Sequence, residues 1–244
     1  MSKKGISLIS VQKDYNRFIN TINSKVAILS TPYVGVQNGY TLSLDTPLVF
    51  VIEDALTLKH AKPPGLKRLE VTITFLMSYS QSKFDCYYKD MMSSNIDVKL
   101  RAINSTEHKS NYFGFHFDLH NQDASSNCEP NSNTISQLHP KYHTQFLQNP
   151  LKQKDFNYGD SLQLDIPRFT HFPMDFILGT SFVLANFAPH IFEELKEDTD
   201  YIRFQRLYQD NLWKPYIEEL NQLLLNSAYE SFNTAHQLHP YWII

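Results

Sequence analysis

Apolar residues recur at helical spacing near the amino terminus of the chain. The set comprises Ile6, Leu8, Ile9, Val11, Tyr15, Phe18, Ile19, Ile22, Val26 and Leu29. Side chains three or four positions apart share one face of a helix, so this spacing predicts one or two amphipathic helices that are broken before Pro32. We therefore expect residues 1–31 to form a helical segment.

Between residues 40 and 166 the pattern changes to that of β-strands. Short runs rich in β-branched and aromatic residues alternate with polar turns, which is typical of antiparallel sheets. The expected strands are 42–46, 48–52, 69–77, 84–88, 97–103, 112–120 and 162–166. A further strand at residues 142–147 would pair with the strand that ends at His120.

Helical spacing returns after Pro173. Residues 174–187 are almost wholly apolar, which predicts a buried helix with Asp175 in its first turn, where a carboxylate complements the helix dipole. The next helical region, residues 198–232, contains Pro215, which is expected to kink or divide it.

These patterns predict a single α+β domain over residues 1–244, with helical parts at 1–31 and 173–232 and a β-rich part at 40–166. We expect a central antiparallel sheet, with the N-terminal helical segment and the C-terminal helices packed on one face, because an amphipathic helix buries its apolar stripe against a sheet. A chain of 244 residues, 42% of them hydrophobic, is long enough to bury a substantial core.

Composition removes several classes of function. Only 7 glycines are present, and neither G-x-G-x-x-G nor the P-loop pattern occurs, which argues against a standard cradle for ATP, GTP or a dinucleotide. The net charge of −3 provides no global basic field for nucleic acid. The two cysteines fit no disulfide framework, and no run of about 18 apolar residues occurs, so we expect a cytoplasmic protein without a membrane span.

Two histidine motifs are the strongest indication of chemistry in the sequence. The first, His116-Phe117-Asp118-Leu119-His120, lies in an expected strand, in which alternate side chains point to the same face. His116, Asp118 and His120 would then form a row of two imidazoles and a carboxylate, which could bind a divalent metal ion or act as an acid–base cluster. The alternative is a strand face that is polar without any function.

The second motif, His139-Pro140-Lys141-Tyr142-His143, follows a long polar loop at residues 121–137. If the strand at 142–147 pairs with the first motif, His139 and His143 converge with the row at one end of the sheet. The loop between the motifs is interpreted either as a flap over the cluster or as a solvated insertion with no role.

Arg168 follows the expected strand at 162–166 and would lie near the same end of the sheet. Its permanently charged guanidinium could clamp a phosphate or a carboxylate there. An ion pair with Asp165 that ties the strand to the next helix is equally consistent with the sequence. The candidate catalytic residues are therefore His116, Asp118, His120, His139, His143 and Arg168, and the candidate metal ligands are His116, Asp118 and His120.

One combination of motifs resembles a recurrent pattern in small uncharacterised bacterial proteins, of domain-of-unknown-function families often found in defence and toxin–antitoxin neighbourhoods. The motifs are His116-Phe117-Asp118, then His139-Pro140-x-x-His143, then Ile166-Pro167-Arg168 and Pro173 before an apolar helix. The similarity covers residues 110–190, and the chain departs from it by Phe169 and Thr170 before His171 and by the insertion at 121–137. The resemblance implies a bacterial cytoplasmic setting and a role in defence, without naming a reaction.

Two classes of function follow. In the first, the site performs hydrolytic or phosphoryl chemistry on nucleic acid or a nucleotide, as a hydrolase or nuclease-like effector, with histidine as general acid and base or as ligand of a divalent ion that activates water. In the second, the chain is a non-catalytic partner-binding or sensor subunit of a defence system, its partner is encoded by a neighbouring gene, and its histidines stabilise the fold. The two classes differ in whether the histidines share one solvent-reachable site.

Overall fold

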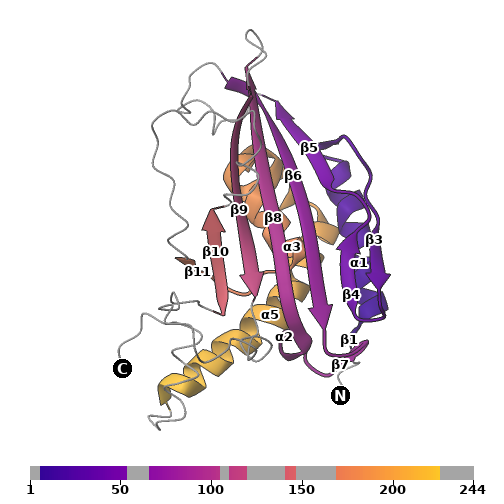
Figure 1. Cartoon of the computed structure of the whole chain (residues 1–244), viewed down its shortest axis with the longest axis vertical. Helices are drawn as coiled ribbons and strands as arrows, with labels where there is room; N and C mark the ends of the chain where they lie inside the picture. Colours follow the sequence, from indigo (N-terminus) through magenta and orange to yellow (C-terminus); the bar gives the residue numbers. More distant parts are fainter. Residues whose placement is uncertain (1–5, 54–65, 105–109, 120–140, 147–168, 226–244) are drawn as a thin grey trace, which may run out of the picture.

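The computed structural model describes residues 6–53, 66–104, 110–119, 141–146 and 169–225. Its centre is an antiparallel sheet, and helices from both ends of the described chain lie against one face of that sheet (Figure 1). The α+β class and the arrangement of helices expected from the sequence are therefore confirmed. The expected strand at 162–166 lies outside the described residues.

The helices and strands follow one another along the chain in this order. They are β1 Ile6–Ser7, α1 Leu8–Asn23, β2 Ala27–Ile28, β3 Val34–Gln37, β4 Thr41–Leu44, β5 Leu48–Glu53, β6 Leu66–Tyr79, β7 Lys83–Phe84, α2 Tyr87–Asp90, β8 Met91–Asn104, β9 Ser110–Leu119, β10 Tyr142–Phe146, β11 Phe169–Thr170, α3 Phe176–Phe187, α4 Pro189–Leu195 and α5 Thr199–Leu225.

The strands of the main sheet are ordered β11-β10-β9-β8-β6-β4-β3, and β5 pairs with β6 and β2 beside this path. Every pairing in the described part is antiparallel, including the expected pairing of β10 with β9. The two longest strands, β6 and β8, pair along almost their whole length and form the middle of the sheet. The described residues of both histidine motifs therefore lie at the edge of the sheet formed by β9, β10 and β11.

The N-terminal helix begins with a capping box, in which the Ser7 hydroxyl accepts the backbone N–H of Ser10 and the Ser10 hydroxyl accepts that of Ser7. The helix ends at Asn23, so the expectation that the helical segment extends to residue 31 was wrong. Ala27 and Ile28 instead form β2, whose pairing with β5 satisfies backbone groups that a helix would have paired internally.

A second correction concerns residues 84–88, which were expected to form a strand. The strand β7 ends at Phe84, and a single helical turn, α2, follows it. The Asp90 carboxylate holds this turn, because Oδ1 accepts the Ser80 hydroxyl at 2.6 Å and Oδ2 accepts the Cys86 backbone N–H at 3.3 Å. When a carboxylate accepts hydrogen bonds at this spacing, a turn is favoured over a strand.

In the C-terminal part, Asp175 is the N-cap of α3 and not a residue of its first turn. Its Oδ1 atom accepts the backbone N–H of Leu178 at 2.9 Å. The helix α5 continues through Pro215, so this proline does not divide it. A separate short helix, α4, which the apolar spacing did not predict, begins at Pro189, a residue suited to a first helical position.

Aromatic side chains fill the space between the helices and the sheet. The Phe176 ring of α3 lies 4.6 Å from the Phe75 ring of β6 and 5.4 Å from the Tyr15 ring of α1, measured between centroids. Tyr208 of α5 packs on Tyr15 at 5.6 Å. The core therefore lies on one side of the sheet, and the opposite side of β8 and β9 is left for polar residues.

Candidate metal or catalytic centre

Alternation along β9 divides its side chains between the two faces of the sheet. Phe115 and Phe117 point toward α3, where both contact the ring of Phe182. His116 and Asp118 alternate with these phenylalanines along the strand, so they project from the face opposite the helices. The packing of the phenylalanines against the core is what fixes the direction of the polar pair.

The register of β10 brings His143 to the same face. His143 lies directly opposite Asp118 in the antiparallel pairing, and Tyr142 lies opposite Leu119. Tyr142 points toward the helices, where its ring stacks on Tyr88 with centroids 6.1 Å apart. The Thr144 hydroxyl donates to the backbone carbonyl of His116 at 2.7 Å, a cross-strand contact that holds this register.

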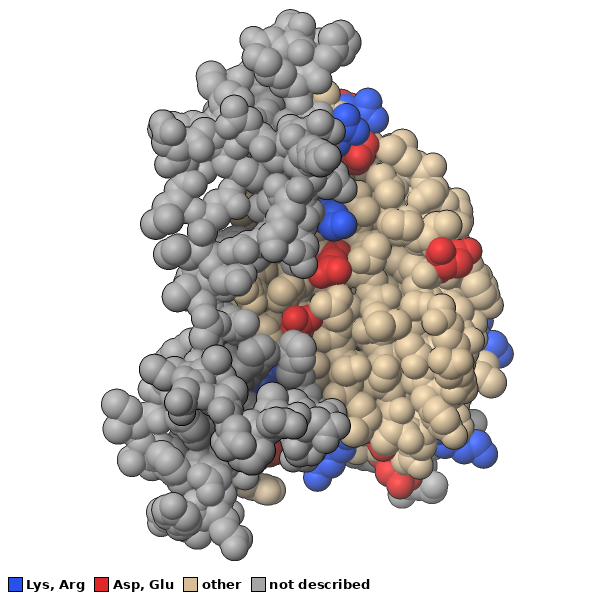
Figure 2. Space-filling model, in the orientation of Figure 1, with Lys and Arg blue, Asp and Glu red and all other residues tan. Residues whose placement is uncertain are grey.

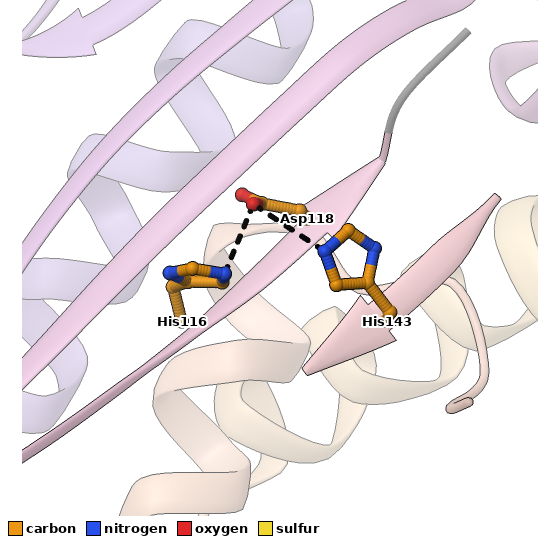
Figure 3. Close-up of side chains that lie close together, drawn as sticks. All are labelled: His116, Asp118 and His143. Atoms are coloured by element: carbon orange, nitrogen blue, oxygen red, sulfur yellow. Dashed lines mark ion pairs between the residues drawn. The ribbon is translucent and has the colours of Figure 1, made fainter. Parts of the chain in front are cut away.

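Three polar side chains converge at this place, as Figure 3 shows. Asp118 Oδ2 lies 3.1 Å from His116 Nε2 and 3.8 Å from His143 Nε2. The two imidazole rings are nearly perpendicular, with centroids 5.9 Å apart. One ligand atom from each of the three residues lies within 4.8 Å of the others, so two nitrogens and one oxygen surround a common point.

Burial differs among the three side chains. The exposed fraction is 1% for His143, 9% for Asp118 and 15% for His116. His116 is thus the member that solvent reaches best, while His143 forms the inner wall of the cluster. The Nε2 atom of His116 is itself buried, and among the described residues it has no hydrogen-bond partner in spite of its short distance to Asp118. The approach therefore lacks hydrogen-bond alignment.

Asn95 of β8 holds the carboxylate from the other side. Its side-chain N–H donates to Asp118 Oδ1 at 2.6 Å, which leaves Oδ2 as the oxygen that faces the two imidazoles. Asn95 lies directly opposite Asp118 in the pairing of β8 with β9. The carboxylate is therefore fixed in orientation by a neutral donor, in the manner of groups that support metal ligands.

Asp97, the next residue of β8 on this face, lies opposite His116. Burial raises the pKa of its carboxyl group; the nearby His116 acts against this change, and the negative charge of Asp118 adds to it. The face thus holds two carboxylates beside two imidazoles, and the Asn95 side chain forms a hydrogen bond with each carboxylate.

Two cations continue this row of β8. Lys99 is exposed and lies two positions beyond Asp97, and Arg101 lies two positions further, 3.8 Å from Glu70 and over the ring of Tyr112. In Figure 2, charged side chains over the sheet lie mainly in one narrow band, and the rest of this face is largely uncharged. Positive charge is therefore available on the face that carries the histidines.

The structure brings together His116, Asp118 and His143 from the residues that the sequence singled out. His120, His139 and Arg168 lie outside the described residues, as do Asp165 and the loop at 121–137. The third member of the cluster among the described residues is therefore His143, whereas the sequence-based ligand set placed His120 in that role.

His171 takes a different place. Its ring packs edge-on against Phe117, with centroids 5.1 Å apart, and its Nδ1 atom contacts the backbone carbonyl of Phe172. Burial lowers the pKa of this imidazole. Because Phe117 belongs to the helix-facing side of β9, His171 does not join the cluster.

Sequence reasoning missed Asn95 and Asp97, although a signal was present. In residues 95–102 of the chain, polar and apolar positions alternate, and the polar ones are Asn95, Asp97, Lys99 and Arg101. Period-two alternation assigns these four side chains to one face. The missing information was the strand partner, because only the register shows that this face meets that of His116.

Comparison of the chain with models of known protein families, with curated proteins and with solved structures finds no match. In the described part of the chain, none of the helices combines the length and the apolar character that a membrane crossing requires. The account of the site therefore rests on its geometry.

Proposed function

We propose that the chain is a hydrolase that cleaves phosphoester bonds in nucleic acid or a nucleotide, with His116, Asp118 and His143 as its reaction centre. The observation that carries this proposal is the position of one carboxylate oxygen between two imidazole nitrogens, at 3.1 and 3.8 Å. Such a cluster has a structural cost, because a polar group taken from water needs a partner. An arrangement of this kind is typical of reaction centres.

The three side chains suit different parts of the reaction. Histidine is the side chain best fitted to take and give protons near neutral pH, and His116 is the more exposed of the two imidazoles. Asp118 orients that imidazole, since its Oδ2 atom lies 3.1 Å from His116 Nε2. His143, almost fully buried, fixes the carboxylate from within. In this assignment His116 accepts a proton from the attacking water.

The choice of a phosphoester rests on the cations of the same face. In the pairing of β8 with β9, Asp97 lies opposite His116, and Lys99 lies opposite Gly114. These are neighbouring residue pairs on the same face of the sheet. Since Lys99 and Asp97 are two positions apart on one strand, the ammonium group projects from the face that carries the cluster. A cation beside the reacting group stabilises the charge that develops on a phosphoryl oxygen.

The proposal is tested by assaying the untagged protein on bis(p-nitrophenyl) phosphate, on single- and double-stranded oligonucleotides and on nucleoside triphosphates. We expect hydrolysis of at least one of them, and a loss of roughly 100-fold or more in kcat/KM for His116→Ala, the usual range for removal of a general acid–base group. His190→Ala, at an exposed histidine of α4, is the matched control. Absence of hydrolysis, or equal activity of wild type and His116→Ala, would overturn the proposal.

The biological setting of the proposal is the one implied by the resemblance of the motifs: a bacterial cytoplasmic protein of a defence or toxin–antitoxin system. The second candidate, a non-catalytic subunit, is supported by exposed aromatic side chains on the opposite side of β9. Phe113 is 46% exposed, and Phe182 of α3, which packs on Phe115 beside it, is 39% exposed. Exposed aromatic residues are enriched at protein interfaces. Identification of the neighbouring genes tests the setting of both candidates.

A further inference from the structure

We infer that His116, Asp118 and His143 form a binding site for one divalent transition-metal ion, with Zn²⁺ as its reference ligand. This inference uses the residues of the proposed hydrolase, but it does not depend on the reaction. In the metal-bound form His116 would be a ligand, and the ion, in place of the imidazole, would activate the attacking water. The donor set is two imidazole nitrogens and one carboxylate oxygen, a combination that suits Zn²⁺ and the neighbouring first-row ions.

The spacing of the donors agrees with a metal site. With metal–ligand bonds of about 2.0–2.2 Å and tetrahedral angles, two donors of one ion lie roughly 3.3 Å apart. His116 Nε2 and Asp118 Oδ2 are 3.1 Å apart, and His143 Nε2 and Asp118 Oδ2 are 3.8 Å apart. All three ligand atoms lie within 4.8 Å of one another, so one ion could contact an atom of each residue.

The orientation of the groups favours a metal over a simple hydrogen-bonded cluster. The buried Nε2 atom of His116 lies close to the carboxylate, yet it forms no hydrogen bond within the part of the chain that the structure describes. A buried polar atom without such a partner is costly, and coordination to a metal ion would satisfy it. Because the nitrogen faces the common point of the three donors, the ion would lie where the hydrogen bond is missing.

The support around the donors is also present. Asn95 donates to Oδ1 of Asp118, and Oδ2 faces the two imidazoles, so the carboxylate would bind the ion through Oδ2. The Thr144 hydroxyl fixes the backbone of His116 to β10, the strand that carries His143. Side chains that orient metal ligands in this way usually raise affinity by one to two orders of magnitude. The ion would join β9 to β10 and so stabilise this edge of the sheet.

Among the described residues the site has three protein ligands, which leaves at least one coordination position for water or substrate. Structural zinc sites close all four positions with protein groups, whereas sites with three protein ligands and an open position are typical of catalysis. The inferred ion is therefore assigned to the open class, and His116, the most exposed ligand, lies on its solvent side.

The test uses the full chain without a histidine tag, stripped with a chelator and titrated with Zn²⁺ by calorimetry. Co²⁺ is then added, because its visible absorption reports the coordination geometry. We expect one equivalent of Zn²⁺ per chain, a higher thermal midpoint on binding, and an affinity at least tenfold lower for His116→Gln and Asp118→Asn. His190→Ala should bind as the wild type does.

Two results would overturn the inference: binding well below one equivalent, or equal affinity in the wild type and both variants. Circular dichroism identifies a variant that fails to fold. If Asp118→Asn is such a variant, the Zn²⁺ affinity of His116→Gln, at the most exposed ligand, decides whether the metal site exists. The test is separate from that of the proposed function. If Zn²⁺ binds but no phosphoester is cleaved, the metal site stands and the hydrolase fails. If the stripped protein cleaves as well as the loaded one, the metal plays no part in the reaction.

Discussion

His143 lies directly opposite Asp118 in the pairing of β10 with β9, and its Nε2 atom is 3.8 Å from the carboxylate. In an antiparallel sheet, residues in direct register share one face, so this pairing alone assigns both side chains to the same side. A slip of β10 by one residue would exchange His143 for Tyr142 or Thr144 and move the histidine to the helix-facing side. The site therefore depends on the register of a single strand pair.

The orienting role of Asn95 leads to the first prediction. Asn95→Ala removes the donor to Asp118 Oδ1 and leaves that carboxylate free to rotate away from the imidazoles. We expect Zn²⁺ affinity to fall by roughly 10- to 100-fold, the usual effect of removing a group that supports a metal ligand. Calorimetric titration measures this loss.

The matched control for Asn95 is Ser93→Ala, since Ser93 lies two positions earlier on the same face of β8 and outside the cluster. If Asn95→Ala binds Zn²⁺ with the same affinity as the wild type, Asp118 does not need the hydrogen bond from Asn95. A similar loss in Ser93→Ala would attribute the effect to β8 as a whole.

A buried carboxyl group predicts the pH dependence of stability. Burial raises the pKa of Asp175 from its ordinary value of 3.8 to about 7, an effect that the hydrogen bond from the Leu178 backbone N–H only partly offsets. The folded protein therefore binds this proton more tightly than the unfolded chain does. The free energy of unfolding should consequently decrease as the pH rises from about 4 to about 7, by about 1.4 kcal/mol for each unit of pKa difference.

Urea denaturation of the wild type and Asp175→Asn across this pH range checks the prediction. The variant keeps an oxygen that can accept the Leu178 N–H but carries no charge, so its stability should lack this contribution. Asp14 and Asp97, whose pKa values are also raised, contribute with the same sign, and His171, whose pKa is lowered, with the opposite sign. The difference between the two proteins isolates Asp175, and parallel curves would contradict the account.

The aromatic core gives a prediction of stability. Phe176 is fully buried, and its ring contacts those of Tyr15, Phe18 and Phe75, which belong to α1 and β6. Phe176→Ala leaves a cavity at this junction and should lower the free energy of unfolding by roughly 3–5 kcal/mol.

Phe113→Ala is the matched control for Phe176, because the Phe113 ring is 46% exposed and loses far fewer contacts on truncation. Denaturant titration should show a much smaller loss for it. Equal losses in the two variants would mean that α3 does not join α1 to the sheet.

Much of the fold could be predicted from the sequence, because strong periodicity reports which side of an element is buried. The capped amphipathic helix at Leu8–Asn23, the long strands β6 and β8 and the apolar helix α3 all carry such patterns. The errors occurred where hydrogen bonds of a side chain or of a neighbouring strand overrode the pattern. Asp90 closes a helical turn within an expected strand, and pairing with β5 draws Ala27 and Ile28 out of an expected helix.

The site was predicted less completely. Alternation along β9 was sufficient to place His116 with Asp118, since both lie on one short strand. The contributions of Asn95 and Asp97 depended on the register between β8 and β9, which no local pattern specifies. The orientation of His171 likewise depends on strand pairing, because alternation at the end of β11 turns its ring toward Phe117.

The most direct test of the account is the diffraction of crystals grown with Zn²⁺, measured at wavelengths on both sides of the zinc absorption edge. The account predicts an anomalous difference peak between His116, Asp118 and His143, with bonds of about 2.0–2.2 Å to one atom of each. Crystals of Asp118→Asn should lose the peak. The account would be contradicted if the wild-type crystals held no peak at this position and the two imidazoles were instead hydrogen-bonded to protein groups.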